Sequence, residues 1–104
     1  MVINKVGIAG YGIIGERRHK YIDDNPQLQT IAVCDKKFDN DTILESGVKC
    51  YSNYQNLLDE PIDILFICLP NYLAPEVTIA GLERGMHIFC EKPPGRNVLD
   101  VENV

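Results

Sequence analysis

Short apolar segments alternate with longer amphipathic segments along this 104-residue chain. The apolar segments are rich in β-branched residues and too short for helices, so each predicts a β-strand. In Ile62–Leu69, apolar side chains occupy both alternating faces, which is typical of a strand covered on both sides. The predicted strands span Val2–Ala9, Leu28–Cys34, Val48–Tyr51, Ile62–Leu69 and Met86–Cys90.

Helical patterns separate these strands, and proline or glycine residues mark their ends. Because strands and helices alternate, we expect a parallel sheet with helices on both faces. Right-handed crossovers then give a doubly wound α/β sheet, the Rossmann fold, in one domain. The predicted helices span Ile14 to about Asp24, Asp39–Gly47, Tyr54–Asp59 and Pro75–Arg84, and Asn97–Val104 is predicted to begin another.

Composition narrows the range of partners. The formal net charge of −5 argues against a nucleic-acid backbone as the ligand. The longest apolar run, Ile64–Leu69, is too short to span a membrane, and the N-terminus lacks a signal-peptide pattern, so we expect a cytoplasmic protein. Four cysteines without a Cys-x-x-Cys pair and two isolated histidines predict no metal site. His19, next to two arginines on the first predicted helix, is expected at the surface.

A glycine-rich segment joins the first predicted strand to the first predicted helix. Gly10-Tyr11-Gly12-Ile13-Ile14-Gly15 matches G-x-G-x-x-G in the strand–turn–helix context that this motif requires. Gly10 would permit a tight turn, Gly12 would let the backbone approach a pyrophosphate, and Gly15 would let helix and strand pack closely. Free amides at the positive end of the helix dipole would hold the anion. The segment therefore predicts a dinucleotide site.

An acidic residue follows at the distance expected for such a site. Asp35 lies twenty positions after Gly15, at the end of the second predicted strand. A carboxylate there can accept hydrogen bonds from both ribose hydroxyls of an adenosine and repels a 2′-phosphate, which favours NAD over NADP. Lys36 and Lys37 follow directly, and because either could contact a 2′-phosphate, NADP stays open as the cofactor.

Other sites fit the same letters less well. A P-loop needs lysine and then serine or threonine after its last glycine, whereas this chain has Glu16 and Arg17. A hydrolase triad has no serine in the G-x-S-x-G context. A methyltransferase that binds S-adenosylmethionine has a similar sheet and an acidic residue after its second strand, so it remains an alternative at this point.

Polar residues also follow the fourth and fifth predicted strands, at the edge where doubly wound sheets bind their ligands. The fourth strand ends in Leu69-Pro70-Asn71, and the fifth continues into Glu91-Lys92-Pro93-Pro94. A lysine beside a nicotinamide can exchange the proton that accompanies hydride transfer. Partial desolvation and the cationic ring would lower the pKa of such a lysine and ease this exchange.

Together these motifs resemble the Gfo/Idh/MocA oxidoreductases, the family of glucose–fructose oxidoreductase and inositol dehydrogenase. In chain order, the residues involved are Gly10–Gly15, Asp35, Leu69-Pro70-Asn71, Ile79–Ile88 and Glu91-Lys92-Pro93. The resemblance implies an NAD(P)-dependent oxidoreductase with Lys92 as the catalytic lysine and a sugar, polyol or related carbonyl compound as substrate. Pro70 and Asn71 would neighbour the nicotinamide, and Glu91 would help to place it and Lys92.

Two departures from the family pattern matter. Many members have a histidine three residues after the asparagine, where this chain has Ala74. Members also continue with a sixth strand and a C-terminal substrate domain, so residues 1–104 are expected to be the N-terminal part of a longer enzyme and inactive alone. Without a sixth strand, the fifth predicted strand would be an exposed edge. A non-catalytic dinucleotide-binding module that acts through association, for example as a homo-oligomer, is therefore an alternative hypothesis.

Overall fold

The computed structural model describes residues 3–69 and 73–90. Several predictions fall outside these residues, namely those for Pro70, Asn71, Glu91, Lys92, Pro93 and the helix at 97–104. The described elements are β1 (Asn4–Ala9), α1 (Ile13–Asp23), β2 (Leu28–Cys34), β3 (Thr42–Ile43), β4 (Lys49–Tyr51), α2 (Tyr54–Leu58), β5 (Ile64–Ile67), α3 (Ala74–Glu83) and β6 (His87–Cys90).

The strands form one sheet in the order β3-β4-β2-β1-β5-β6. All neighbouring strands are parallel except β3 and β4. After β1 the chain first builds outward through β2 and β4 and then returns to the other side of β1 through β5 and β6. The doubly wound α/β fold predicted from the sequence is therefore confirmed, with the change of direction between β1 and β5.

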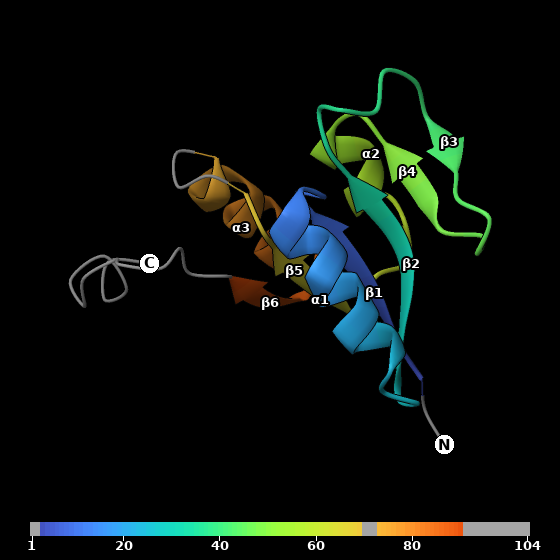
Figure 1. Cartoon of the computed structure of the whole chain (residues 1–104). Coiled ribbons are helices and arrows are strands. Elements are labelled where there is room, and N and C mark those ends of the chain that lie inside the picture. Colours follow the sequence, from blue (N-terminus) through green and yellow to red (C-terminus); the bar gives the residue numbers. More distant parts are fainter. Residues whose placement is uncertain (1–2, 70–72, 91–104) are drawn as a thin grey trace.

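Helices cover both faces of this sheet (Figure 1). On the first face, Ile22 of α1 belongs to an apolar cluster with strand residues Val6, Ile8 and Val33. On the second face, the apolar cluster combines residues of α2 and α3 with strand residues and includes Leu57, Val77, Leu65 and Ile67. Burial of β5 is uneven, since Leu65 and Ile67 are fully buried while Ile64 and Phe66, on the α1 side, are half-buried.

The predicted helix over Asp39–Gly47 is wrong. This segment instead contains β3, which pairs with β4 in an antiparallel hairpin. The N–H of Gly47 donates to the carbonyl oxygen of Leu44 at 2.8 Å, and Gly47 has a φ of +91°. The glycine that was expected to end a helix therefore closes a turn between two strands, a position that favours glycine. The sixth member of the sheet is β3 rather than a strand beyond β6.

Candidate functional site

The glycine turn, residues Gly10–Gly15, connects the end of β1 to α1. Gly10 has a φ of +97°, and its N–H donates to the carbonyl oxygen of Cys34 at the end of β2. The N–H of Glu16 donates to the carbonyl oxygen of Gly12 at 2.9 Å, which is the first hydrogen bond of the helix. The strand–turn–helix context that the motif requires is therefore present.

The three motif glycines have different surroundings. A Cβ atom at Gly10 would lie 2.5 Å from the carbonyl oxygen of Cys68, and one at Gly15 would clash with the carbonyl oxygen of Gly10. A Cβ atom at Gly12 would have no heavy atom within 4 Å. Gly10 and Gly15 are thus required by the packing of the protein itself, whereas the space at Gly12 is open to a ligand.

Asp35 lies directly beside this turn. Its Oδ2 atom accepts a hydrogen bond from the N–H of Tyr11 at 2.7 Å, and its Oδ1 atom accepts one from the N–H of Lys37 at 3.0 Å. These bonds fix the orientation of a half-buried carboxylate at the end of β2. Each carboxylate oxygen has a second lone pair, so the group can still accept hydrogen bonds from a ligand.

The two lysines after Asp35 differ in their contacts. Lys36 is exposed, whereas the Lys37 ammonium lies 3.8 Å from Oε2 of Glu16 and 5.0 Å from the centre of the Tyr11 ring. Lys37 is therefore held on the outer side of the turn by an ion pair and a cation–π contact.

His19 is not at the surface, contrary to the expectation from sequence. It is 9% exposed, and its ring nitrogens lie 2.7 Å from the Tyr11 hydroxyl oxygen and 2.9 Å from Oδ2 of Asp23. Burial, followed by nearby acidic groups with Glu16 first among them, raises the pKa of the Tyr11 hydroxyl. The i, i+4 spacing of His19 and Asp23 on one helix was the available sequence signal for half of this arrangement.

The groove beside α1 has a volume of about 550 Å³. Its lining residues are Tyr11, Glu16, His19, Lys20, Asp23, Asp24 and Ser46. It thus adjoins the outer side of the glycine turn. Beneath the turn, burial raises the pKa of the Cys34 thiol to about 12, against a smaller lowering by a hydrogen bond from Gly10. The Cys34 thiol therefore stays protonated, as expected of a buried structural cysteine.

The end of β5 reaches the same turn from the other side. The N–H of Cys68 donates to the carbonyl oxygen of Ala9 at 2.7 Å, and the half-buried Leu69 has a methyl carbon 3.1 Å from the position of a Cβ at Gly10. Cys90 pairs with Ile67, so β6 ends at the same edge of the sheet. The structure thus brings together the glycine turn, Asp35, Leu69 and the ends of β5 and β6.

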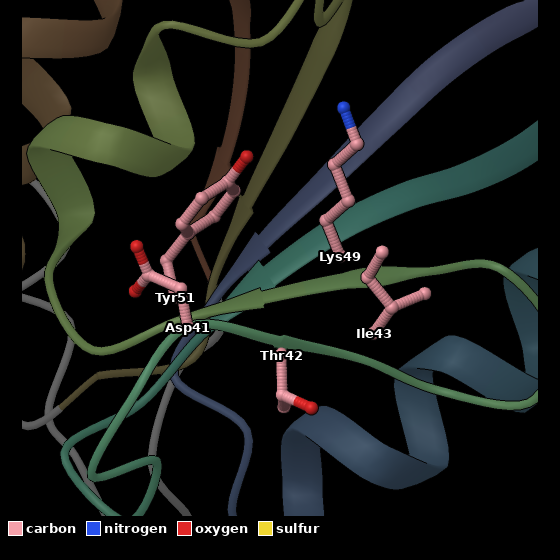
Figure 2. A pocket seen from close by; sticks show the side chains of 5 residues that line it. All are labelled: Asp41, Thr42, Ile43, Lys49 and Tyr51. Carbon is pink, nitrogen blue, oxygen red and sulfur yellow. The ribbon is translucent and has the colours of Figure 1, made fainter.

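A second hollow, of about 240 Å³, lies at the β3 edge (Figure 2). Figure 2 shows Lys49 and Tyr51 pointing to the same side of β4. Both bind Oε1 of Glu60, at 3.0 and 2.9 Å. Burial and then this bond raise the pKa of Tyr51 to about 12. The polar groups on this side of β4 therefore satisfy one another.

Metal and membrane features can be stated for the described residues. No cluster of three histidine, cysteine, aspartate or glutamate side chains suited to a metal ion occurs in 3–69 and 73–90. None of the helices in this part of the chain has the length and apolarity needed to cross a membrane.

A sequence profile described as "Oxidoreductase family, NAD-binding Rossmann fold" matches residues 4–104. The chain belongs to the Gfo/Idh/MocA oxidoreductase family. The family predicted from the motifs is thus confirmed, and the methyltransferase alternative is replaced by an NAD-binding oxidoreductase domain.

Named relatives of this Gfo/Idh/MocA domain are dehydrogenases. It is 32% identical over 95 residues to the D-glucoside 3-dehydrogenase of Escherichia coli K12, covering 86% of this chain and 27% of the relative. It is 31% identical over 100 residues to the inositol 2-dehydrogenase/D-chiro-inositol 3-dehydrogenase of Lactiplantibacillus plantarum, covering 88% and 28%. The D-galactose-1-dehydrogenase structure from Rhizobium etli matches with a TM-score of 0.77 at 27% identity, covering 99% and 33%. The chain therefore spans about a third or less of these relatives.

Proposed function

We propose that this chain is the NAD(H)-binding domain of a longer, two-domain cytoplasmic dehydrogenase. The proposed reaction is hydride transfer between the nicotinamide and a sugar, a polyol or a related carbonyl compound. The main support is the open space at Gly12, beside the start of α1 and close to the oriented carboxylate of Asp35. The dehydrogenase names of the relatives agree with this chemistry.

The binding half of the proposal uses the residues around β1, α1 and β2. Backbone N–H groups at the start of α1, where Ile13 and Ile14 lie, would hold the pyrophosphate at the positive end of the helix dipole. Asp35 would accept hydrogen bonds from the adenosine ribose. This carboxylate favours NAD, while Lys36 and Lys37 keep NADP as a second possible cofactor.

The catalytic half of the proposal uses residues that follow β5 and β6 in sequence. Leu69 and the neighbouring Pro70 and Asn71, together with Glu91 and Pro93, would border the nicotinamide, which supplies or accepts the hydride when bound. Lys92 would exchange a proton with the substrate oxygen as charge develops on it. Further catalytic residues would come from a substrate domain.

Titration of the chain with NADH, followed by fluorescence or calorimetry, tests the binding step. We expect saturable binding, and Asp35→Ala should weaken it by roughly ten- to a hundredfold, because a hydrogen bond to a charged group contributes about 1.5–3 kcal/mol. Asp63→Ala is the matched control, since the Asp63 carboxylate also accepts a backbone N–H, from Lys5 at 2.8 Å, but lies at the opposite edge of the sheet.

Two results would contradict the proposal. The first is an absence of saturable NADH binding at millimolar concentration. The second concerns the longer enzyme, in which Lys92→Ala should lower turnover by about 10²–10⁴ with NADH affinity nearly unchanged. Unaltered turnover in that variant would remove the catalytic role of Lys92 while leaving the binding role of the domain intact.

A non-catalytic role through association has one specific observation in its favour. In the described sheet β6 pairs only with β5, and β6 is therefore an edge strand. Such an edge offers unpaired backbone groups to a second chain. Sedimentation velocity distinguishes the two functions, because association through the edge predicts dimers at high concentration, and a purely monomeric chain argues against it.

A further inference from the structure

We propose that His19 is a positioning residue for NAD(H) binding and that it acts through the Tyr11 side chain on the glycine turn and Asp35. The inference rests on the proposed function, because the turn and Asp35 are the groups assigned to the cofactor. His19 itself lies on the α1 side of the turn, where it contacts Tyr11 rather than the open space at Gly12.

Tyr11 links the two parts of this arrangement. Its backbone N–H donates to Oδ2 of Asp35 at 2.7 Å, and its hydroxyl oxygen lies 2.7 Å from Nδ1 of His19. Tyr11 also stands between Gly10 and Gly12, and two flanking glycines leave the backbone few intrinsic restrictions. The side chain of Tyr11 is therefore the part of this residue that can hold the turn in place.

His19 is in turn held by a second hydrogen bond. Its Nε2 atom lies 2.9 Å from Oδ2 of Asp23, and the other carboxylate oxygen of Asp23 accepts the N–H of Thr30 in β2 at 3.3 Å. A carboxylate selects the tautomer with a proton on Nε2, which leaves Nδ1 as an acceptor for the Tyr11 hydroxyl. The chain of hydrogen bonds thus runs from β2 through α1 to the glycine turn.

This geometry assigns a consequence to each end of the chain. If the Tyr11 hydroxyl loses its acceptor, the turn and the N–H that orients Asp35 become less restrained. A ligand then has to order the turn as it binds, and that ordering lowers its affinity without changing any group that touches it. His19 would therefore act by preorganisation, which separates its effect from that of Asp35.

Two substitutions of His19 separate the two ring nitrogens. The amide oxygen of His19→Asn can take the place of Nδ1 and accept from Tyr11, whereas His19→Gln places its amide near Nε2 and leaves the Tyr11 hydroxyl without its acceptor. We expect His19→Gln and Tyr11→Phe each to weaken NADH binding by about three- to tenfold, the range expected for one neutral hydrogen bond. His19→Asn should retain most of the affinity.

Stability should rank the His19 variants in the opposite order, because glutamine has the higher helix propensity and His19 lies within α1. The double variant Tyr11→Phe/His19→Gln should bind NADH about as tightly as either single variant, since both remove the same bond. Tyr21→Phe, at a tyrosine that is 71% exposed on the same helix, should bind like the parent chain.

The outcomes distinguish this inference from the proposed function. If the parent chain does not bind NADH, both fail together. If the parent binds NADH and Tyr11→Phe and His19→Gln bind equally well, the proposed function stands and the role of His19 is overturned. Equal losses in His19→Asn and His19→Gln, or losses that follow the thermal midpoints, also overturn it. The His19 pair decides the question even if Tyr11→Phe does not fold.

Discussion

The inner and outer sides of the glycine turn differ in what occupies the space beside the backbone. On the inner side, a side chain at Gly10 or Gly15 would meet a main-chain carbonyl group. On the outer side, Gly12 has no neighbour within 4 Å, and the Asp35 carboxylate lies close by, held by the N–H of Tyr11. One motif therefore combines glycines that the fold needs with a glycine that only a ligand needs.

The largest effect is expected on the inner side, at Gly15. Gly15→Ala should lower the free energy of unfolding by about 3 kcal/mol, because the new methyl group would press on the backbone of Gly10, which cannot move without displacing the turn. Denaturant unfolding of the two proteins measures the difference.

Gly81→Ala is the control for Gly15→Ala. In α3, a Cβ atom at Gly81 would meet Cδ1 of Ile88 at 2.7 Å, the end of a side chain that can rotate away. The gain in helix propensity of about 1 kcal/mol offsets much of the remaining cost. If the two variants lose the same stability, the inner side of the turn is not the rigid contact described above.

The next effect is expected on the outer side, at Gly12. Gly12→Ala should weaken NADH binding by about tenfold or more, because a methyl group would occupy the approach of the pyrophosphate. It should cost less than about 1 kcal/mol of stability, the usual difference at a helix N-cap. NADH titration and denaturant unfolding of the same sample give both numbers.

The hairpin glycine provides the opposite control. Gly47 has a φ of +91° and open space around it, but it lies in the β3–β4 turn. Gly47→Ala should therefore lose about 1 kcal/mol of stability from backbone strain and keep its NADH affinity. An unchanged affinity in Gly12→Ala would show that no ligand approaches the backbone at that glycine.

Sequence predicted the inner side of this site well and the outer side less completely. The β1–α1–β2 unit follows from hydrophobic periodicity and from local glycine spacing, which act over a few residues. The β3–β4 hairpin was missed because its polar residues resemble a short helix, whereas packing of Phe38 and Leu44 against the α1-side core belongs to the tertiary structure. The Tyr11–His19 bond was missed for a similar reason, since it depends on how the turn folds back onto α1.

The smallest effect concerns charge on the outer side. Lys37 lies 3.8 Å from Glu16, and both side chains are about half exposed, so this ion pair contributes at most about 1 kcal/mol. Glu16→Gln removes a negative charge and frees the Lys37 ammonium to meet a 2′-phosphate. We therefore expect NADPH affinity to rise relative to NADH affinity by about two- to fivefold.

Titrations of both cofactors at low and high salt measure this selectivity, and the change should shrink at high salt because exposed charges are screened. Glu83→Gln, which makes the same charge change on α3, should leave the ratio of affinities unaltered. A ratio that is unchanged in Glu16→Gln, or that shifts toward NADH, would mean that Lys37 does not reach the ribose. Selectivity for NAD would then depend on Asp35 alone, and the Glu16–Lys37 pair would serve only to support the Tyr11 ring.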